Sequence, residues 1–295
     1  MDQANNLRSI IKKQNQVTTS NCRIITVTSG KGGVGKSNMT VNLALQFRRQ
    51  GKRVIIFDAD FGLANVEVMF GVIPKYTLAD LIFRGRDIKD IITEGPEGVQ
   101  FISGGSGIAK LVNLDNEQLK RLLYKLSELE SMADVIIIDT GAGISSSVLE
   151  FVAASPEVIL VTTPEPTSIT DSYALLKALS MYPGYDAAHS SVMVITNKVS
   201  QMSESQNIYE KLHAVTSKFL NINLIYLGAV PQDTSITKSV MKQKPVTLAY
   251  PSAGAARALE TIGRRLISGE RKIPVSNEKK GVLRFFGNVF NRRRF

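Results

Sequence analysis

The chain has 295 residues, of which 43% are hydrophobic and 21% are charged, and its formal net charge is +10. This composition is typical of a globular protein and excludes an intrinsically disordered chain. The charge is concentrated at the ends, because residues 1–23 sum to +3, residues 271–295 sum to +7, and residues 24–270 sum to zero. A neutral body with two basic ends is not the pattern of a uniformly basic nucleic-acid-binding protein, so we do not expect nucleic acid as a partner.

Three further absences narrow the class of protein. The longest apolar runs, such as residues 135–138, are far shorter than the roughly 20 residues of a membrane span. The N-terminus has no apolar stretch of the kind found in secretory signals. Cys22 is the single cysteine, which permits neither an internal disulfide nor a multi-cysteine metal site within one chain. We therefore expect a cytoplasmic protein.

In chain order, the first predicted element is a leader at residues 1–23. Asp2 can cap a short helix, and Leu7, Ile10 and Ile11 form a small apolar stripe at helical spacing. This segment precedes the first strand-like run, so we expect it to be appended to the folded body.

Short β-branched runs then alternate with helical patterns. Strands are predicted at residues 24–28, 53–57, 99–102, 135–138, 158–162, 192–196 and 224–227. Helices are predicted at residues 36–50, 114–130, 168–181, 204–220 and 253–267. The strand runs are apolar on both faces, as in sheets that helices cover on both sides. The predicted fold class is therefore α/β, with a doubly wound, mostly parallel sheet in one domain at residues 24–270.

The strongest motif is the glycine-rich run GKGGVGKS at residues 30–37, which matches the P-loop pattern, follows a predicted strand and opens a predicted helix. Glycines allow the backbone N–H groups to face phosphate oxygens. Lys36 can reach the β- and γ-phosphates, and the Ser37 hydroxyl can bind Mg²⁺. The predicted nucleotide contacts in this region are Gly30, Lys31, Gly32, Gly33, Val34, Gly35, Lys36, Ser37 and Asn38.

The second lysine of this loop, Lys31, is not needed to cradle phosphates within one chain. The run KGGVGKS resembles the deviant Walker A motif of the MinD/ParA ATPase family. The resemblance implies the same fold and an ATP-dependent homodimer, in which Lys31 reaches across to the partner's nucleotide. Lys31 would then supply a catalytic positive charge in trans, as an arginine finger does.

Carboxylates follow two predicted strands, at the edge where open α/β sheets bind ligands. Asp58 and Asp60 follow residues 53–57, and Asp139 follows residues 135–138. A P-loop needs such groups to hold a metal and to orient water. The run DADFGLAN resembles switch I of the MinD branch, and DTGAGI resembles its switch II. By that resemblance Asp60 orients the attacking water, while Asp58 and Asp139 support the Mg²⁺ site.

The run TNKVS at residues 196–200 indicates which base is bound. It resembles the guanine-reading pattern NKxD, but Ser200 replaces the carboxylate that would accept from guanine. Since an Asn amide can pair with the edge of adenine, ATP and ADP are favoured over guanine nucleotides. The family resemblance implies that Asn197 contacts adenine and that Pro231, Gln232 and Asp233 close over the base. The alternative for Asn197 is a turn residue after a strand.

The C-terminal run forms an amphipathic pattern when it is placed on a helix. Phenylalanines lie on one face and arginines on the other, which suits an anionic membrane interface. The tail at residues 271–295 resembles the membrane-targeting helix of MinD. The predicted membrane contacts are Val282, Leu283, Arg284, Phe285, Phe286, Val289, Phe290 and Arg292. Two alternatives stay open, namely a helix that packs on its own domain and a DNA-binding arm.

The leader carries the pattern DQAxxLR, which resembles the activator element of the FlhG (YlxH) family of MinD-like flagellar number regulators. In that family the element stimulates FlhF, a GTPase of the signal-recognition-particle type. The resemblance therefore implies FlhF and flagellar C-ring proteins as partners. The predicted partner-activating residues are Asp2, Gln3, Ala4, Leu7 and Arg8.

Together these patterns predict a Mg²⁺-dependent ATPase, slow without stimulation, that dimerises with ATP and associates reversibly with the inner face of the cell membrane. Its expected output is flagellar number or placement. One alternative is a MinD-like division-site regulator. Another is a ParA-like partitioning ATPase, which would need a basic patch on the neutral body. A redox enzyme related to the nitrogenase iron protein would need at least two cysteines per chain, whereas this chain has one.

Overall fold

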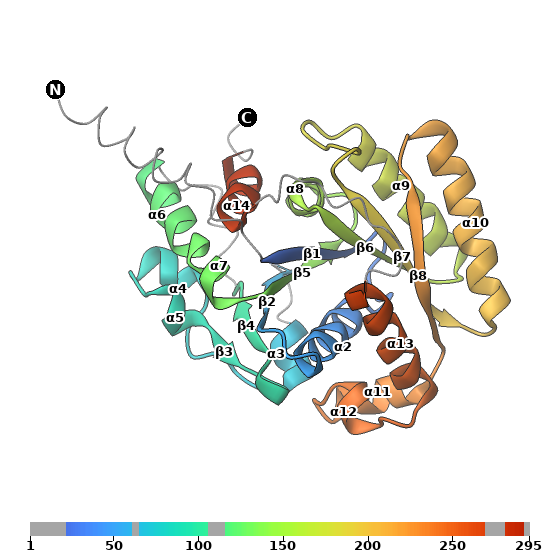
Figure 1. Cartoon of the computed structure of the whole chain (residues 1–295), viewed down its shortest axis with the longest axis horizontal. Helices are drawn as coiled ribbons and strands as arrows, with labels where there is room; N and C mark the ends of the chain where they lie inside the picture. The colour runs from blue at the N-terminus through green and yellow to red at the C-terminus, as the bar shows by residue number, and fades with distance from the viewer. Residues whose placement is uncertain (1–21, 61–64, 106–115, 269–280, 292–295) are drawn as a thin grey trace.

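A computed structural model describes residues 22–60, 65–105, 116–268 and 281–291. The described strands form one eight-stranded sheet in the order β3-β4-β2-β5-β1-β6-β7-β8 (Figure 1). Strand β3 pairs antiparallel with β4, and the other pairs of this sheet are parallel. The strands are β1 (Arg23–Ser29), β2 (Val54–Ala59), β3 (Thr93–Glu94), β4 (Gln100–Ser103), β5 (Val135–Ala142), β6 (Glu157–Thr162), β7 (Ser191–Val199) and β8 (Leu224–Pro231).

Helices cover both faces of the sheet (Figure 1). One face packs against α2 (Lys36–Arg49), α3 (Asn65–Phe70), α11 (Thr234–Met241), α12 (Val246–Ala249) and α13 (Gly254–Ser268). The other packs against α4 (Leu78–Phe83), α5 (Ile88–Ile91), α6 (Asn116–Ser127), α7 (Leu129–Met132), α8 (Ser146–Ala154), α9 (Pro166–Ser180), α10 (Met202–Phe219) and α14 (Val282–Asn291). A short 3₁₀ turn, η1 (Pro96–Gly98), precedes β4.

The strand sequences explain this layering. Alternate residues of a strand point to opposite faces, so a strand that is apolar at every position must be covered on both sides. In β5, Val135 and Ile137 join the core beneath α2, whereas Ile136 and Ile138 join the core beneath α6 and α14. The predicted doubly wound, mostly parallel sheet is confirmed, and all seven predicted strands are present.

Strand β3 was not predicted, and neither were the helices α3, α4, α5, α8, α11 and α12. Strand β3 is two residues long, which is too short to show an alternating pattern. Helix α8 was missed because residues 148–154 are all buried, so its sequence carries no polar stripe at helical spacing. The predicted helix at residues 114–130 corresponds to α6 and α7, which follow one another.

The C-terminal helix α14 forms as an amphipathic helix, but its apolar face is buried in its own domain. The exposed fractions of Val282, Phe285, Phe286 and Val289 are 0%, and that of Phe290 is 4%. Leu283 is half-buried, and Arg284 lies on the exposed side. In this conformation the face expected to meet lipid is therefore unavailable to it. The expected boundary between a body at 24–270 and a tail at 271–295 does not separate two cores.

Aromatic contacts fix where α14 lies. The rings of Phe286 and Phe57 of β2 have centroids 5.1 Å apart, and those of Phe290 and Phe151 of α8 are 6.3 Å apart. Helix α14 therefore lies over the sheet between α6 and α8 (Figure 1). The predicted contact Arg292 and the partner-activating residues Asp2, Gln3, Ala4, Leu7 and Arg8 lie outside the described residues.

Candidate functional site

The carboxyl ends of the parallel strands meet at one edge of the sheet, and the phosphate loop lies there between β1 and α2. Gly35 ends the loop in a left-handed conformation (φ 99°) that glycine adopts readily. Gly30 has no room for a side chain, since a Cβ would lie 2.1 Å from the backbone oxygen of Asp171 in α9. The loop is thus tightly enclosed at its start, and its last residue leads directly into the N-terminus of α2, which favours anions.

Lys36 and Asp139 form the buried centre of this edge. Both are nearly inaccessible, with exposed fractions of 8% and 0%. Thr40 Oγ1 donates to Asp139 Oδ1 over 2.9 Å. Burial raises the pKa of Asp139 to about 6, although contacts with Ser37 and Lys36 oppose the change. Burial lowers the pKa of Lys36, and the charges of Asp139 and Asp60 oppose that shift.

Asp58 lies near the end of β2, beside Asp139 of β5, and Asp60 directly follows β2. Asp58 pairs in register with Asp139 across β2 and β5, so two buried carboxylates lie on neighbouring strands. Burial first, and then the charge of Asp139, raise the pKa of Asp58 well above its usual value. Asp60 is half-buried, and its Oδ2 accepts from Asn65 Nδ2 over 3.1 Å. The structure therefore brings together the three carboxylates that the sequence singled out.

These residues suit a nucleotide with a bound cation. Asp139 Oδ2 is buried and has no hydrogen-bond partner in the described part of the chain. A buried carboxylate oxygen without a partner is costly, and a cation would relieve that cost. Among the described residues no group of three or more His, Cys, Asp or Glu side chains could hold a metal by itself. In P-loop proteins the phosphates of a bound nucleotide and a Ser or Thr hydroxyl, here that of Ser37, supply further ligands to the metal.

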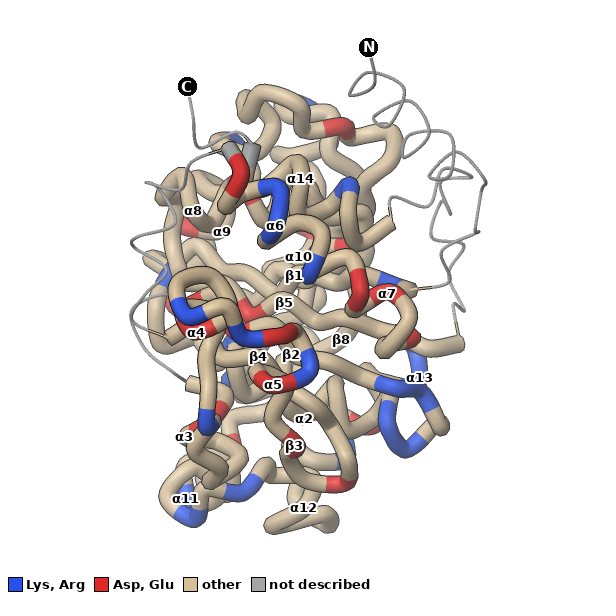
Figure 2. The backbone as a smooth tube through the Cα atoms, turned by 90° about the vertical axis from the view of Figure 1, so that its left-hand side faces the viewer, with Lys and Arg blue, Asp and Glu red and all other residues tan. Residues whose placement is uncertain are grey.

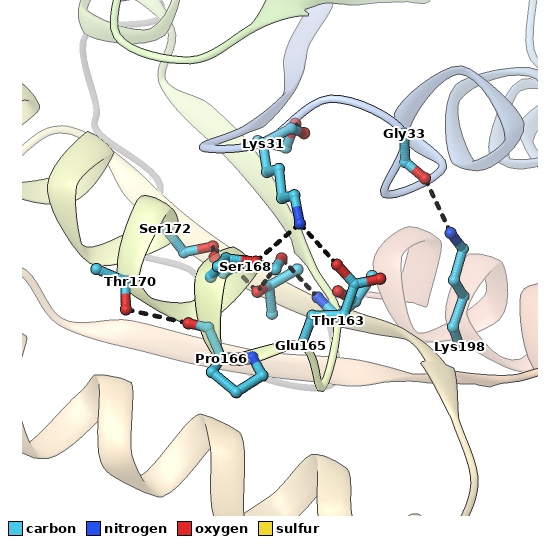
Figure 3. A network of polar contacts seen from close by, with 12 residues as sticks. Lys31, Gly33, Thr163, Glu165, Pro166, Ser168, Thr170, Ser172 and Lys198 are labelled. Carbon is cyan, nitrogen blue, oxygen red and sulfur yellow. Dashed lines mark hydrogen bonds and ion pairs between the residues drawn. The ribbon is translucent and has the colours of Figure 1, made fainter.

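Lys31 points away from its own phosphate loop (Figure 3). Its Nζ donates to Glu165 Oε2 and to Thr167 Oγ1, each over 2.7 Å. The hydrogen bond and charge of Lys31 lower the pKa of the exposed Glu165 carboxyl. Both partners come from the start of α9, after β6. Neither partner was predicted from the sequence, although the run TPEPTS after a predicted strand marks this turn.

Asn197 lies at the end of β7 and contacts the phosphate loop. Its Nδ2 donates to the backbone oxygen of Val34 over 2.7 Å, and its Oδ1 accepts from the backbone N–H of Lys198. Lys198 Nζ donates to the backbone oxygen of Gly33 over 3.0 Å (Figure 3). One N–H of the Asn197 amide is left for a base, so adenine contact stays a prediction. The contacts of Lys198 were not anticipated.

Asp233, which was predicted to close over the base, has a structural role. Both carboxylate oxygens of Asp233 accept backbone N–H groups, from Ser235 and Ala255, which fixes the start of α11 and the start of α13. These bonds lower the pKa of Asp233 and leave its carboxylate committed to the fold. Pro231 is half-buried and Gln232 is exposed, at the end of β8 next to β7. Asn38 lies in the first turn of α2.

Comparisons with known proteins agree with this geometry. The ParA family model, described as a NUBPL iron-transfer P-loop NTPase, matches residues 21–267. The antiactivator FleN of Pseudomonas aeruginosa is 41% identical over 264 residues, covering 90% of this chain and 91% of that protein. The flagellum site-determining protein YlxH of Helicobacter pylori is 34% identical over 268 residues, covering 90% and 89%.

Solved structures show the same fold. The MinC:MinD complex of Aquifex aeolicus matches with a TM-score of 0.66 and 21% identity over 83% of this chain and 96% of that chain. MinD of Pyrococcus horikoshii complexed with Mg-ADP matches with a TM-score of 0.65 and 23% identity over 84% and 98%.

Proposed function

The chain belongs to the ParA family of P-loop NTPases, and from that premise we propose that it is an ATP-dependent dimerising switch that controls flagellar number or placement. Two relatives support the flagellar setting, since they are named an antiactivator and a flagellum site-determining protein. The observation that carries the switch is the position of Lys31. This lysine belongs to the phosphate loop, yet Glu165 and Thr167 bind it away from that loop. This position keeps the ammonium group away from its own nucleotide site, which supports our proposal that it acts toward a second copy of the chain.

We assign separate roles in ATP hydrolysis to the described residues of the site. The loop backbone and Lys36 would hold the nucleotide phosphates, while Ser37, Asp58 and Asp139 would hold Mg²⁺. The metal, when bound, neutralises charge on the phosphates. Asp60 would orient the attacking water, with its carboxylate fixed by Asn65. Because Lys31 would come from the partner, a single copy should be a slow ATPase.

We propose that membrane contact requires α14 to leave the domain. None of the described helices is both long and apolar enough to cross a membrane, so attachment would be peripheral. Each phenylalanine released into water would lose about 1.5–3 kcal/mol of burial energy, so the freed face needs lipid to cover it. Nearby basic residues would each add about 1 kcal/mol at an anionic surface. Two helices in a dimer would bind far better than one, because the second insertion is effectively intramolecular.

The leader is proposed to stimulate FlhF, and the body to meet flagellar C-ring proteins. Sequence similarity to FleN and YlxH supports this setting. A peptide of residues 1–23 should accelerate GTP hydrolysis by purified FlhF, with Gln3 as the residue suited to orient water. If Gln3→Ala leaves the stimulation unchanged, that role for Gln3 is wrong. If the peptide gives no stimulation, a division-site regulator becomes the better proposal.

Lipid cosedimentation tests the switch. The full chain should pellet with vesicles that contain anionic lipid in the presence of ATP, and much less with ADP. Removal of residues 278–295 should abolish pelleting in both cases. Equal pelleting in ATP and ADP, or undiminished pelleting after the truncation, would contradict the proposal.

A MinD-like division regulator is the second candidate, because solved MinD structures share this fold. A partitioning function on DNA has less support, since acidic and basic segments are interspersed over the face that Figure 2 presents. Iron transfer also has less support. The single cysteine is buried, and burial raises its pKa to about 12, so the thiolate that binds metal is disfavoured.

A further inference from the structure

Two consecutive peptide groups of the phosphate loop are bound by two consecutive residues at the end of β7. Asn197 Nδ2 holds the carbonyl oxygen of Val34 over 2.7 Å, and Lys198 Nζ holds the carbonyl oxygen of Gly33 over 3.0 Å. These bonds span more than 160 residues of sequence. They are thus tertiary contacts that the loop cannot form by itself.

Both contacts are specifically built. Asn197 is 2% exposed, and its Oδ1 is fixed by the backbone N–H of Lys198 over 2.9 Å. Lys198 adopts a left-handed conformation (φ 59°), which is unfavourable for a residue with a side chain. Gly35 approaches so closely that a Cβ would lie 2.4 Å from Asn197 Nδ2. The chain therefore accepts backbone strain and close packing at the place where β7 meets the loop.

Because the peptide bond is planar, these contacts also fix the direction of the neighbouring N–H groups. In a trans peptide the C=O and the following N–H point in opposite directions. Holding the carbonyls of Gly33 and Val34 toward β7 therefore turns the N–H groups of Val34 and Gly35 away from β7. Glycine peptides rotate easily, and Gly33 has a positive φ of 75°, so without these bonds the loop could present carbonyl oxygens in place of N–H groups.

We propose that Lys198 is a positioning residue for the phosphate loop: together with Asn197 it holds the loop with its N–H groups directed at the nucleotide phosphates before any nucleotide binds. The ligand class is a nucleoside diphosphate or triphosphate, and this inference rests on the proposed ATP binding. Lys198 acts through the loop and not by touching the base. Lys31 and Glu165 are charged groups near Lys198, since both lysines lower the pKa of the Glu165 carboxyl. The lysines differ in their bonds, because Lys31 binds α9 whereas Lys198 binds the loop.

Hydrogen exchange of the nucleotide-free full chain tests the first part. Lys198→Met removes the donor and keeps the length of an exposed side chain. We expect faster deuterium uptake in residues 30–37 of this variant, with unchanged uptake in the strands of the core. Lys198→Arg, which can still donate to Gly33, should keep the uptake of the original protein. Lys120→Met removes an exposed lysine from α6 and is the matched control. Unchanged loop exchange in Lys198→Met, or no rescue by Arg, would overturn the proposal.

Nucleotide affinities test the second part. Lys198→Met should bind ADP about 10-fold more weakly, as expected for a hydrogen bond from a charged donor. AMP, which lacks the β-phosphate that the loop cradles, should lose less than about 2-fold. The loss for ADP should persist at 0.5 M KCl, because screening weakens long-range attraction but not a loop geometry. Equal losses for AMP and ADP, or a loss that vanishes in salt, would overturn it. Both readouts precede dimerisation, so failure of the dimer switch would leave them unaffected.

Discussion

The phosphate-loop edge and the C-terminal helix use burial in opposite ways. At the edge, Lys36, Asp58 and Asp139 are charged groups held out of water, and Asp139 Oδ2 lacks a partner in the described part of the chain. At α14, the phenylalanines are apolar and enclosed by other aromatic rings. Under the proposed function, a ligand would complete the first region, whereas the second is already complete and would have to be taken apart to act. In the proposed switch, the free energy of nucleotide binding at the phosphate-loop edge would drive the release of α14.

The substitution Lys36→Ala tests whether the buried charges at the phosphate-loop edge serve the nucleotide and not the fold. We expect ATP turnover to fall by at least 100-fold, because the lysine would hold charge on the transferred phosphate. Thermal stability of the nucleotide-free protein should change little, since burial lowers the pKa of Lys36 despite the charges of Asp139 and Asp60, so folding does not favour its charged form. Turnover measured beside a melting curve checks both statements. A large loss of stability without nucleotide would show that Lys36 is mainly structural.

The substitutions Phe57→Ala and Phe286→Ala test whether α14 unfolds separately from the sheet. The two rings touch, with centroids 5.1 Å apart, so each substitution leaves a comparable cavity. Phe57 belongs to β2, and its loss should lower the free energy of unfolding by about 3–5 kcal/mol. The loss for Phe286 should be smaller, because in the proposed switch α14 leaves the domain before the sheet unfolds. Urea denaturation measures both values. Equal costs would mean that α14 does not separate from the domain.

Asp139→Asn tests the cost of the unpartnered carboxylate. A carboxyl pKa raised to about 6 by burial means that the folded state binds its proton more tightly than the unfolded state does. Its ionisation therefore destabilises the fold as pH rises from about 4 to 6. The variant should be more stable than the original chain by about 3 kcal/mol at pH 8, with the difference vanishing below about pH 4. It should also lose Mg²⁺-dependent tightening of ATP binding. A variant less stable at pH 8 would contradict this assignment.

Glu165→Gln should give the smallest effect. The substitution weakens the contact that holds Lys31 within its own subunit, which is an exposed ion pair and hence a weak one. We expect ATP-dependent dimerisation to tighten by roughly 3-fold, with no change in ATP affinity of the monomer. Sedimentation equilibrium with ATP gives the dimerisation constant. Glu210→Gln in α10 removes another exposed carboxylate and serves as a control. Weaker dimerisation in Glu165→Gln would show that Glu165 assists the dimer instead.

The sheet and the phosphate site could be predicted because their signals are local. Fully apolar strands indicate a covered parallel sheet, and the residues of the loop lie together in sequence. Asp58, Asp60 and Asp139 were found because they follow apolar runs predicted as strands, and parallel strands place such positions at one edge of the sheet.

The partners of these residues could not be predicted, because they depend on distant segments. Glu165 binds Lys31 across 134 residues, and Lys198 binds Gly33 across 165 residues. The position of α14 could not be predicted for the same reason, because it depends on contacts with distant segments. Its amphipathic pattern predicts an apolar face in search of cover, but it does not specify whether lipid or the Phe57 and Phe151 rings provide that cover.

The most direct test of the central claim mixes two inactive variants. Lys31→Ala lacks the lysine given in trans, and Asp60→Ala lacks the residue that orients water, so each alone should hydrolyse ATP at the slow monomer rate. In a mixed dimer, the Lys31→Ala subunit keeps its own Asp60 and receives Lys31 from the other subunit. An equal mixture should therefore recover up to about one quarter of the original dimer activity, since half of the dimers are mixed and each has one working site. A mixture that stays inactive, or full activity of Lys31→Ala alone, would contradict the trans role of Lys31.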